Sequence, residues 1–305
     1  MHINKMKKMF AGLSILSNVV LSTLKIVAGI ISGSLSIISE AIHSLSDLAA
    51  SVLTYFSVIK SSQPADKDHP YGHGKYEDMS GFIEGVLIIF ASLFIMYEAV
   101  RKIILGISAE AENTLGITVM LIAVVMNIIV SSLLFSVAKK SNSISLYADG
   151  EHLRTDVFSS LGVLIGLILI KITGCTVLDP IIALFVAVLI YRTGYKISKR
   201  AFMRLLDYSL PNEDIEKIKE IVDKFKDSVK LKENSIKARQ VGPATDIDLI
   251  LQFPGDTPIC ACHNICDEIE NQIQTIYQNC SISIHSEPVC YENNCQGNCE
   301  NRKSD

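Results

Sequence analysis

The 305-residue chain contains no tryptophan and has no excess of positive charge. Its 28 Lys and Arg are outnumbered by 32 Asp and Glu, so the formal net charge of −4 gives no indication of a nucleic-acid partner. Only one of the eight cysteines, Cys175, lies before residue 259. Disulfide frameworks are typical of small, self-contained secreted domains. The seven cysteines after residue 259 belong to a segment that we expect to be cytoplasmic. Free thiols or metal ligands are therefore favoured over disulfides.

Two kinds of catalytic signature are also missing from the apolar segments. No His-Glu-x-x-His motif occurs, and no Ser or Cys in a span is paired with a base. These absences argue against an intramembrane metalloenzyme. The first apolar run is too long for a cleavable signal peptide, and no small-residue cleavage site follows it. We therefore expect that run to span a membrane.

Long apolar runs, by contrast, fill the first two hundred positions. A helix needs about 20 mostly apolar residues to cross a bilayer. Six stretches meet this length, at roughly 10–32, 36–60, 80–105, 114–138, 145–171 and 177–195. The sequence therefore predicts a domain of six transmembrane helices over residues 1–205.

The basic residues are distributed unequally between the two ends of these spans. Cytoplasmic loops carry an excess of Lys and Arg. With the N-terminus inside, the outer side has Arg101, Lys102 and Lys171, and the inner side has Lys5, Lys7, Lys8, Lys60, Lys67, Lys75, Lys139, Lys140, Arg192, Lys196, Lys199 and Arg200. We expect a multi-pass protein of the plasma membrane with both termini in the cytoplasm.

Residues 206–288 read as a small cytoplasmic α/β domain. Apolar residues in "NEDIEKIKEIVDKFKDSV" recur at helical spacing, and "SIKARQVGP" and "TDIDLILQF" alternate as strands around a turn at "VGPAT". A second helix in "PICACHNICDEIENQIQTIY" and a strand in "CSISIHSEP" complete the order αββαβ, which suits a sheet with helices on one face. Residues 289–305 are expected to form a mobile, cysteine-rich tail.

Two histidine–aspartate pairs lie within predicted spans. "EAIHSLSDLAAS" places His43 four residues before Asp47, and "DGEHLRTDVFSS" places His152 four residues before Asp156. Residues four apart share a helix face. Two imidazoles and two carboxylates suit tetrahedral zinc better than magnesium or Cu(I). The alternative is that each pair is an internal hydrogen bond steadying two helices, but ionisable groups inside a membrane usually mark a pathway.

Lys25, Glu84 and Glu98 are also charged and lie in the predicted spans. Lys25 either snorkels or pairs with a carboxylate. Glu84 and Glu98 either belong to a proton route or face water near a helix end. Sequence alone leaves these alternatives open.

Two other groups have the composition of metal ligands. Asp66, His69 and His73 have the spacing Asp-x-x-His-x-x-x-His in a polar loop, and the alternative is a solvated loop whose histidines serve packing. The cysteines are either a clamp for soft metals or small buried thiols followed by a redox-sensitive tail, and they match no closed zinc-finger spacing. They are Cys260, Cys262, Cys266, Cys290, Cys295 and Cys299.

Several motifs together resemble the cation diffusion facilitator family. They are "GSLSIISEAIHSLSDLAAS", "PADKDHPYGHGKYED" followed by "SGFIEG", "YADGEHLRTDVFSSLGVLIG", "RQVGP" and "IHSEP", which span the chain to about residue 288. The resemblance implies a homodimeric metal–proton antiporter with six helices and a cytoplasmic domain of metallochaperone-like fold. It assigns the transport site to the two His–Asp pairs. Histidine at position 43 looks like the zinc-type pattern, with cadmium, cobalt and iron as alternative ions.

The resemblance also implies roles outside the spans. Asp66, His69 and His73 match a metal site between the membrane and cytoplasmic domains, and Lys75 and Asp207 match a charged pair that interlocks two subunits. His263, His285 and Glu287 match ligands at the dimer contact of the cytoplasmic domains. Asn234 and Ile250 stand where some relatives have further histidines, and Asp248 is a candidate substitute on the strand of Ile250. An ordinary polar interface is the alternative there.

Two functions compete on these observations. One is divalent-cation efflux by alternating access, and the other is a membrane protein that senses metal without transporting it. A sensor needs only cytoplasmic ligands, whereas a transporter needs a site at membrane depth. The duplicated His–Asp pairs therefore favour the transporter over the sensor and over any enzyme.

Overall fold

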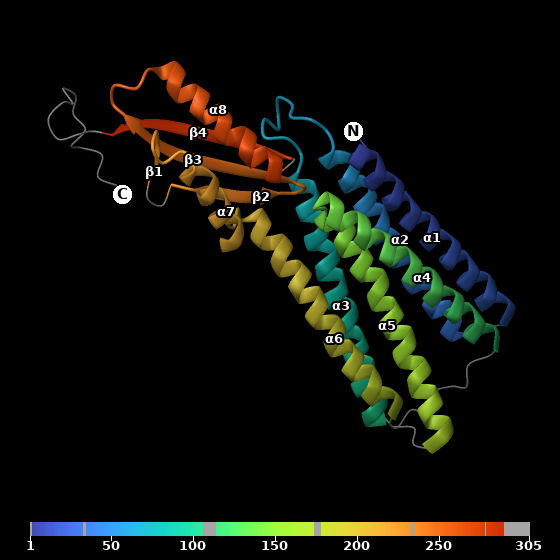
Figure 1. The fold of residues 1–305 in the computed structure, drawn as a ribbon. Coiled ribbons are helices and arrows are strands. Elements are labelled where there is room, and N and C mark those ends of the chain that lie inside the picture. The colour runs from blue at the N-terminus through green and yellow to red at the C-terminus, as the bar shows by residue number, and fades with distance from the viewer. Residues whose placement is uncertain are drawn as a thin grey trace. The chain divides into compact units, whose positions relative to one another are not determined.

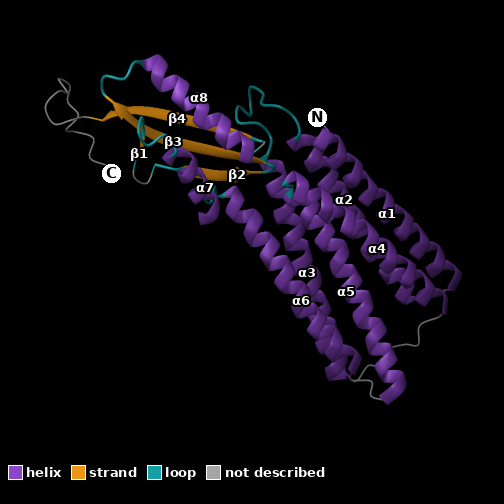
Figure 2. Ribbon diagram, viewed as in Figure 1, coloured by secondary structure: helices purple, strands orange, loops and turns teal. Residues whose placement is uncertain are grey.

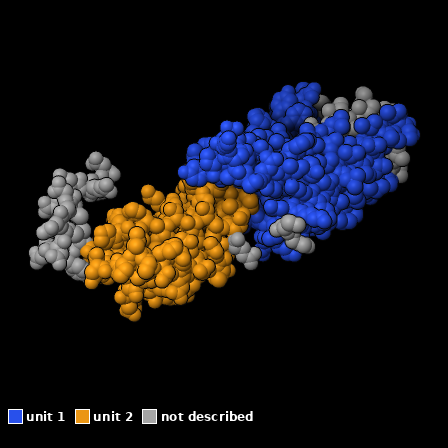
Figure 3. All heavy atoms as spheres, turned by 90° about the horizontal axis from the view of Figure 1, so that it is seen from above, with its two compact units in different colours: residues 1–206 blue, residues 207–305 orange. Residues whose placement is uncertain are grey.

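The computed structural model describes residues 2–32, 35–105, 114–173, 178–232, 235–277 and 279–289. The chain forms two compact units, residues 1–206 and residues 207–305 (Figure 3).

Six long helices make up the first unit (Figures 1 and 2). Four of them contain segments long and apolar enough to cross a membrane, within Ile3–Ala28, Lys75–Leu105, Ile117–Ser141 and Pro180–Leu205. The two others, which carry the His–Asp pairs, are 27 and 30 residues long and exceed the length of about 20 that a bilayer requires. The six are α1 (His2–Ser32), α2 (Leu35–Ser61), α3 (Lys75–Leu105), α4 (Thr114–Ser141), α5 (Ile144–Thr173) and α6 (Leu178–Leu205).

Helix α5 lies at the centre of this bundle, in contact with each of the other five. Helices α3 and α6 pack most closely, because glycines replace side chains where they cross. A Cβ on Gly194 would lie 3.0 Å from the carbonyl oxygen of Gly85, and a Cβ on Gly85 would lie 2.7 Å from the backbone nitrogen of Ser198. Small residues at such a crossing are typical of helices that pack in a membrane.

The polarity of this unit is that of a membrane protein, with charged groups inside and apolar side chains outside. On α3, Glu77 and Glu84 are fully buried, whereas Phe90 and Phe94 are both 65% exposed. Lipid solvates the apolar surface, while a buried charge needs a partner or a function. A functional site is therefore expected among the buried polar side chains.

The second unit is a mixed sheet covered by two helices. Its elements are α7 (Asn212–Asp223), β1 (Lys230–Leu231), β2 (Lys237–Val241), β3 (Ala244–Pro254), α8 (Ile259–Ile276) and β4 (Cys280–Val289). Strand β3 pairs antiparallel with β1 and β2 and parallel with β4. The predicted order αββαβ is confirmed, and the structure adds the two-residue strand β1, which is too short to show an alternating pattern.

Helices α7 and α8 contact each other and share one core with β3. Ile218 and Ile269 are fully buried there, and alternate residues of β3 from Thr245 to Phe253 point into the same core. The other residues of β3 therefore point away from the helices. The predicted turn at "VGPAT" is a two-residue hairpin loop between Val241 and Ala244, and Gly242 adopts the positive φ of 55° that such loops favour.

Candidate functional site

The packing of α2 against α5 brings together three of the four predicted transport-site residues. His152 Nε2 lies 3.0 Å from Asp47 Oδ1, and both side chains are at least nine-tenths buried. Ligand atoms of these two residues and of Asp156 all lie within 4.8 Å of one another. His43 is in α2, one turn before Asp47, but its side chain lies outside the described residues.

The spacing of these atoms is close to what a metal ion requires. Zinc bonds nitrogen and oxygen at about 2.0–2.2 Å, so ligand atoms of a tetrahedral site lie about 3.4 Å apart. A small cavity of about 50 Å³ is lined by Asp47, Asp156, Lys25 and Asn127 among others. A water molecule needs only about 10–15 Å³ of such volume, so the cavity gives the two carboxylates access to water.

A second group forms in the loop between α2 and α3, outside the spans. The ligand atoms of Asp66, His69 and His73 all lie within 4.8 Å of one another. His73 Nδ1 is 3.2 Å from the carbonyl oxygen of Pro64, and this contact directs Nε2 toward Asp66. His73 Nε2 approaches Asp66 Oδ2 to 3.2 Å but makes no hydrogen bond with described residues. His73 Nε2 and Asp66 Oδ2 therefore face the same point without a hydrogen bond between them, as two ligands of one metal ion do.

The backbone of this loop holds Asp66 in its charged form. The amide of His69 donates to Asp66 Oδ1 at 2.7 Å, and the turn continues with Gly72 at a φ of 82°. The pKa of Asp66 is lowered, chiefly because of this backbone hydrogen bond, although desolvation opposes the shift. A carboxylate that is already deprotonated binds a cation without first releasing a proton.

A row of polar side chains continues along α2 from the transport-site cluster. Asp47, Ser51, Thr54 and Ser61 lie on one face of the helix by their spacing, and Ser51 and Thr54 are fully buried. With about 1.5 Å of rise per residue, the row covers about 21 Å. After Asp47, each hydroxyl in the row donates to a buried carboxylate on another helix, namely Asp149, Glu84 and Glu77.

These three carboxylates are all fully buried. Ser51 donates to Asp149 at 3.0 Å, and Ser80 donates to Glu84 at 3.1 Å. Asp149 Oδ2 and Glu84 Oε2 are buried and have no hydrogen-bond partner among the described residues. Glu84 interacts electrostatically with Asp149 and with His152. We call Asp149, Glu84 and Glu77 the acidic column.

Glu77 is at the end of the column and is the only one of the three that forms an ion pair with a described lysine or arginine. It forms a buried ion pair with Lys7 of α1 and accepts hydrogen bonds from Ser61 and Ser143. Sequence reasoning left Glu84 undecided and missed Asp149 and Glu77. The available signal was the row of small hydroxyl residues on α2, which spacing alone cannot distinguish from ordinary helix packing.

Comparison with known proteins identifies the relatives of this chain. The transmembrane domain of cation efflux proteins matches residues 12–206, and their cytoplasmic domain matches residues 210–289. The chain belongs to the cation diffusion facilitator family. It is therefore a multi-pass membrane protein and a transporter for the efflux of divalent cations rather than an enzyme.

The alignments of this cation diffusion facilitator with individual relatives cover most of this chain and most of each relative. It is 32% identical to the uncharacterized transporter sll1263 of Synechocystis over 93% of this chain and 91% of that protein. It is 32% identical to the transporter MJ0449 of Methanocaldococcus jannaschii over 87% and 92%. It is 26% identical to the cation-efflux pump FieF of Shewanella oneidensis over 93% and 95%.

The cytoplasmic candidates of this facilitator do not form a group of three or more ligands in the described part of the chain. Asp248 and His285 point away from the helices on β3 and β4, and Glu287 follows on β4, where it pairs with Lys232 at 3.0 Å. His263 is on α8, is largely exposed, and lies 3.5 Å from Asp267. Ile250 is directly opposite His285 in the β3–β4 register, and Asn234 lies outside the described residues.

The described cysteines of the second unit are free thiols. Cys262 and Cys266 face the core of the unit, while Cys260 is exposed. Burial raises the pKa of Cys266. A thiol that stays protonated is a poor metal ligand. Cys260, Cys262 and Cys266 do not form a close ligand group in the described part of the chain, and Cys290, Cys295 and Cys299 lie outside it.

The remaining predicted residues have the following positions. Lys75 is the first residue of α3. Asp207 has a φ of 57° and forms an ion pair with Arg239 at 3.0 Å. Lys25 donates to Ser44 Oγ at 2.7 Å, and Glu98 pairs with Arg101 at 3.2 Å near the end of α3.

Proposed function

We propose that this facilitator exports zinc in exchange for protons through a site formed by His43, Asp47, His152 and Asp156. The observation that carries the proposal is the buried convergence of Asp47, His152 and Asp156 between two membrane helices. A nitrogen–oxygen ligand set suits zinc, while cadmium, cobalt and iron remain alternative ions of the same site. The name of the pump FieF is consistent with efflux of a cation but does not decide among these ions.

Proton exchange follows from the chemistry of the ligands. A histidine must be neutral to bind a metal, so metal binding displaces protons from the site. The acidic column offers these protons a route, because chains of buried Asp, Glu and His serve as proton relays in transporters. When the next metal ion displaces a proton from His152, that proton passes to Asp149 and then to Glu84, toward the cytoplasmic end of α3 where Glu77 lies. Protons then move inward as zinc moves outward.

We further propose that the functional unit is a homodimer in the plasma membrane, with both termini in the cytoplasm. The match to the cytoplasmic domain of cation efflux proteins supports it, as does the distribution of basic residues at the span ends. His263 on α8 and His285 on β4 are both largely exposed, which is expected of ligands shared between two copies. Metal bound between the copies would draw their cytoplasmic domains together and regulate transport.

The test is zinc movement into proteoliposomes under an imposed pH gradient, with the wild type compared with Asp47→Ala. Loss of an outer partner of a metal ligand already costs about 10- to 100-fold in affinity, so loss of a ligand is expected to reduce gradient-driven transport at least about 100-fold. Asp68→Ala removes an exposed carboxylate of the loop and should leave transport unchanged.

Other outcomes decide against the proposal in different ways. Tight zinc binding without movement in the wild type would favour a metal sensor that does not transport. Transport that survives Asp47→Ala would place the pathway elsewhere.

A further inference from the structure

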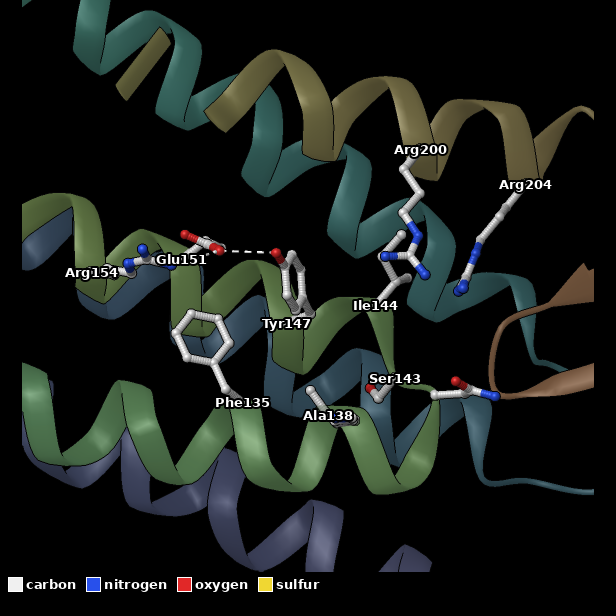
Figure 4. A pocket seen from close by; sticks show the side chains of 11 residues that line it. Phe135, Ala138, Ser143, Ile144, Tyr147, Glu151, Arg154, Arg200 and Arg204 are labelled. Carbon is white, nitrogen blue, oxygen red and sulfur yellow. Dashed lines mark hydrogen bonds and ion pairs between the residues drawn. The ribbon is translucent and has the colours of Figure 1, made fainter. Parts of the chain in front are cut away.

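One cavity in the membrane unit is separate from the transport-site cluster. It has a volume of about 360 Å³ and lies between the end of α4, the start of α5 and the end of α6 (Figure 4). Its volume falls in the range of about 300–1,000 Å³ that is usual for ligand pockets. Its lining includes Lys139, Arg154, Arg200 and Arg204, with Glu151 as the only carboxylate.

Two of these four cations are already neutralised by carboxylates. Arg154 lies 3.4 Å from Glu151, which also accepts a hydrogen bond from Tyr147 at 2.9 Å. Arg204 lies 3.6 Å from Asp78. The charge of these two arginines is therefore balanced within the protein.

Lys139 and Arg200 are the unbalanced cations. Neither forms an ion pair or side-chain hydrogen bond with any residue that the structure describes. Arg200 and Arg204 extend from α6 toward Ile144, the first residue of α5 (Figure 4). The N-terminus of a long helix carries a partial positive charge and unpaired amides, which adds to the attraction for an anion.

The surroundings of the pocket are suited to a lipid. Phe135 lines the cavity, and Arg154 lies over the rings of Phe135 and Phe158 at 6.0 and 5.2 Å. Phe158, Leu161 and Ile165 follow Arg154 on α5 at positions four, seven and eleven along, and all three are exposed. They form an apolar stripe on the helix face below the cationic pocket.

We propose that this pocket binds the phosphate-bearing headgroup of an anionic phospholipid, with an acyl chain along the stripe of Phe158, Leu161 and Ile165. Basic pockets between transmembrane helices are a recurrent way of binding such headgroups. The bound lipid bridges α4, α5 and α6 and so braces the helix that carries His152 and Asp156. Inorganic phosphate has the same charge chemistry as the headgroup but cannot use the apolar stripe.

The test compares two double variants that remove the same charge at neighbouring positions. Lys139→Gln with Arg200→Gln alters the pocket, whereas Lys140→Gln with Lys199→Gln alters the adjacent exposed residues that do not line it. Each full-length protein, in neutral detergent, is titrated with phosphatidylglycerol, with phosphatidylcholine and with inorganic phosphate. Binding is followed by native mass spectrometry and by the shift in melting temperature.

We expect the wild type and the control to bind phosphatidylglycerol selectively, and the pocket variant to bind it at least about tenfold more weakly. The lipid-free melting temperatures of the two double variants should agree, which separates binding from folding. Equal weakening in both variants would overturn the proposal in favour of general surface charge. Equal binding of phosphatidylcholine, or competition by inorganic phosphate at micromolar concentration, would overturn the lipid assignment.

Discussion

The loop residue Asp66 illustrates how backbone geometry prepares a single ligand. Its carboxylate accepts hydrogen bonds from the amides of Asp68 and His69, so its charged form is favoured before any metal arrives. The side chain of His73 is almost fully buried against it, whereas that of His69 is 43% exposed. The loop thus holds one fixed imidazole and one that is free to adjust to an ion.

The lowered pKa of Asp66 predicts how the loop responds to acid. Its usual value is 3.8, and a group with a depressed pKa stabilises the fold above that value and loses the effect as the pH falls through the lowered one. We expect the amide of His69 to stay protected from hydrogen exchange down to pH 3.8 and to lose protection below it. In Asp66→Asn the protection should be weaker at neutral pH and should not change as the pH falls below 3.8. Equal protection in both proteins would contradict this account of the loop.

Residue spacing predicted the loop group, and it placed each His–Asp pair on one helix face, because residues three and four apart lie close together. The approach of Asp47 to His152, 105 positions away, depends on the packing of α2 against α5. Spacing could not predict Asp149 or Glu77. Their importance depends on hydroxyls of α2 that reach them across helix contacts, with Ser51 and Asp149 separated by 98 positions. Serine and threonine are common in membrane helices, so their presence alone does not identify a polar row.

At the scale of a helix, α3 provides a matched pair of carboxylates that tests the acidic column. Glu84 is fully buried beside Thr54, and Glu98 is partly exposed beside Arg101. Glu84→Gln preserves shape but removes the exchangeable proton. A positioned proton carrier contributes about 100-fold or more to a proton transfer, so we expect gradient-driven zinc transport to fall by roughly that factor.

Zinc affinity at equilibrium should change little in Glu84→Gln, because Glu84 is not a proposed ligand. Glu98→Gln should transport as the wild type does. Proteoliposome transport and calorimetric zinc binding measure the two quantities separately. A parallel loss of binding and transport in Glu84→Gln would mean that Glu84 acts on the metal site and not on proton transfer.

The crossing of α3 and α6 depends on Gly85. An added Cβ would lie 2.5 Å from Ser198 Oγ and 2.7 Å from the Ser198 nitrogen, and backbone cannot move aside as a flexible side chain can. Overpacking typically costs about 1–3 kcal/mol, so Gly85→Ala should lower the melting temperature of the protein in detergent by several degrees. Gly12→Ala is the control, since its Cβ would meet Tyr55 at an ordinary 3.7 Å. A melting temperature unchanged by Gly85→Ala would show that α3 and α6 separate at little cost.

The six helices and the αββαβ order could be predicted because each depends on local periodicity and length. The strand β1 could not, since Lys230 and Leu231 are defined only by pairing with β3. The burial of Glu84 could not be predicted either. It depends on neighbours on α2 and α5, which the local sequence does not reveal. Contacts between distant segments carry the information that local patterns lack.

At the scale of the whole molecule, we expect a second copy of the chain to cover the face of the sheet that lies opposite α7 and α8 in the second unit. Asp248 and His285 are exposed on β3 and β4, and the core lies entirely on the side of α7 and α8. His285 and Glu287 offer a nitrogen and a carboxylate 3.8 Å apart, which is fewer ligands than zinc requires. A second copy of the chain would supply the rest.

This arrangement predicts a response to zinc that only the homodimer shows. As zinc rises, hydrogen exchange of β4 should slow in the full-length protein, because ligands from two copies close over the strand. His285→Ala should abolish the slowing, whereas His2→Ala, which removes the one histidine outside the proposed sites, should preserve it. Asp47→Ala should also preserve it, since the transport site is a separate ligand group. If zinc slows the exchange of β4 as strongly in His285→Ala, the domains associate without a metal between them, and an ordinary polar interface is the better description.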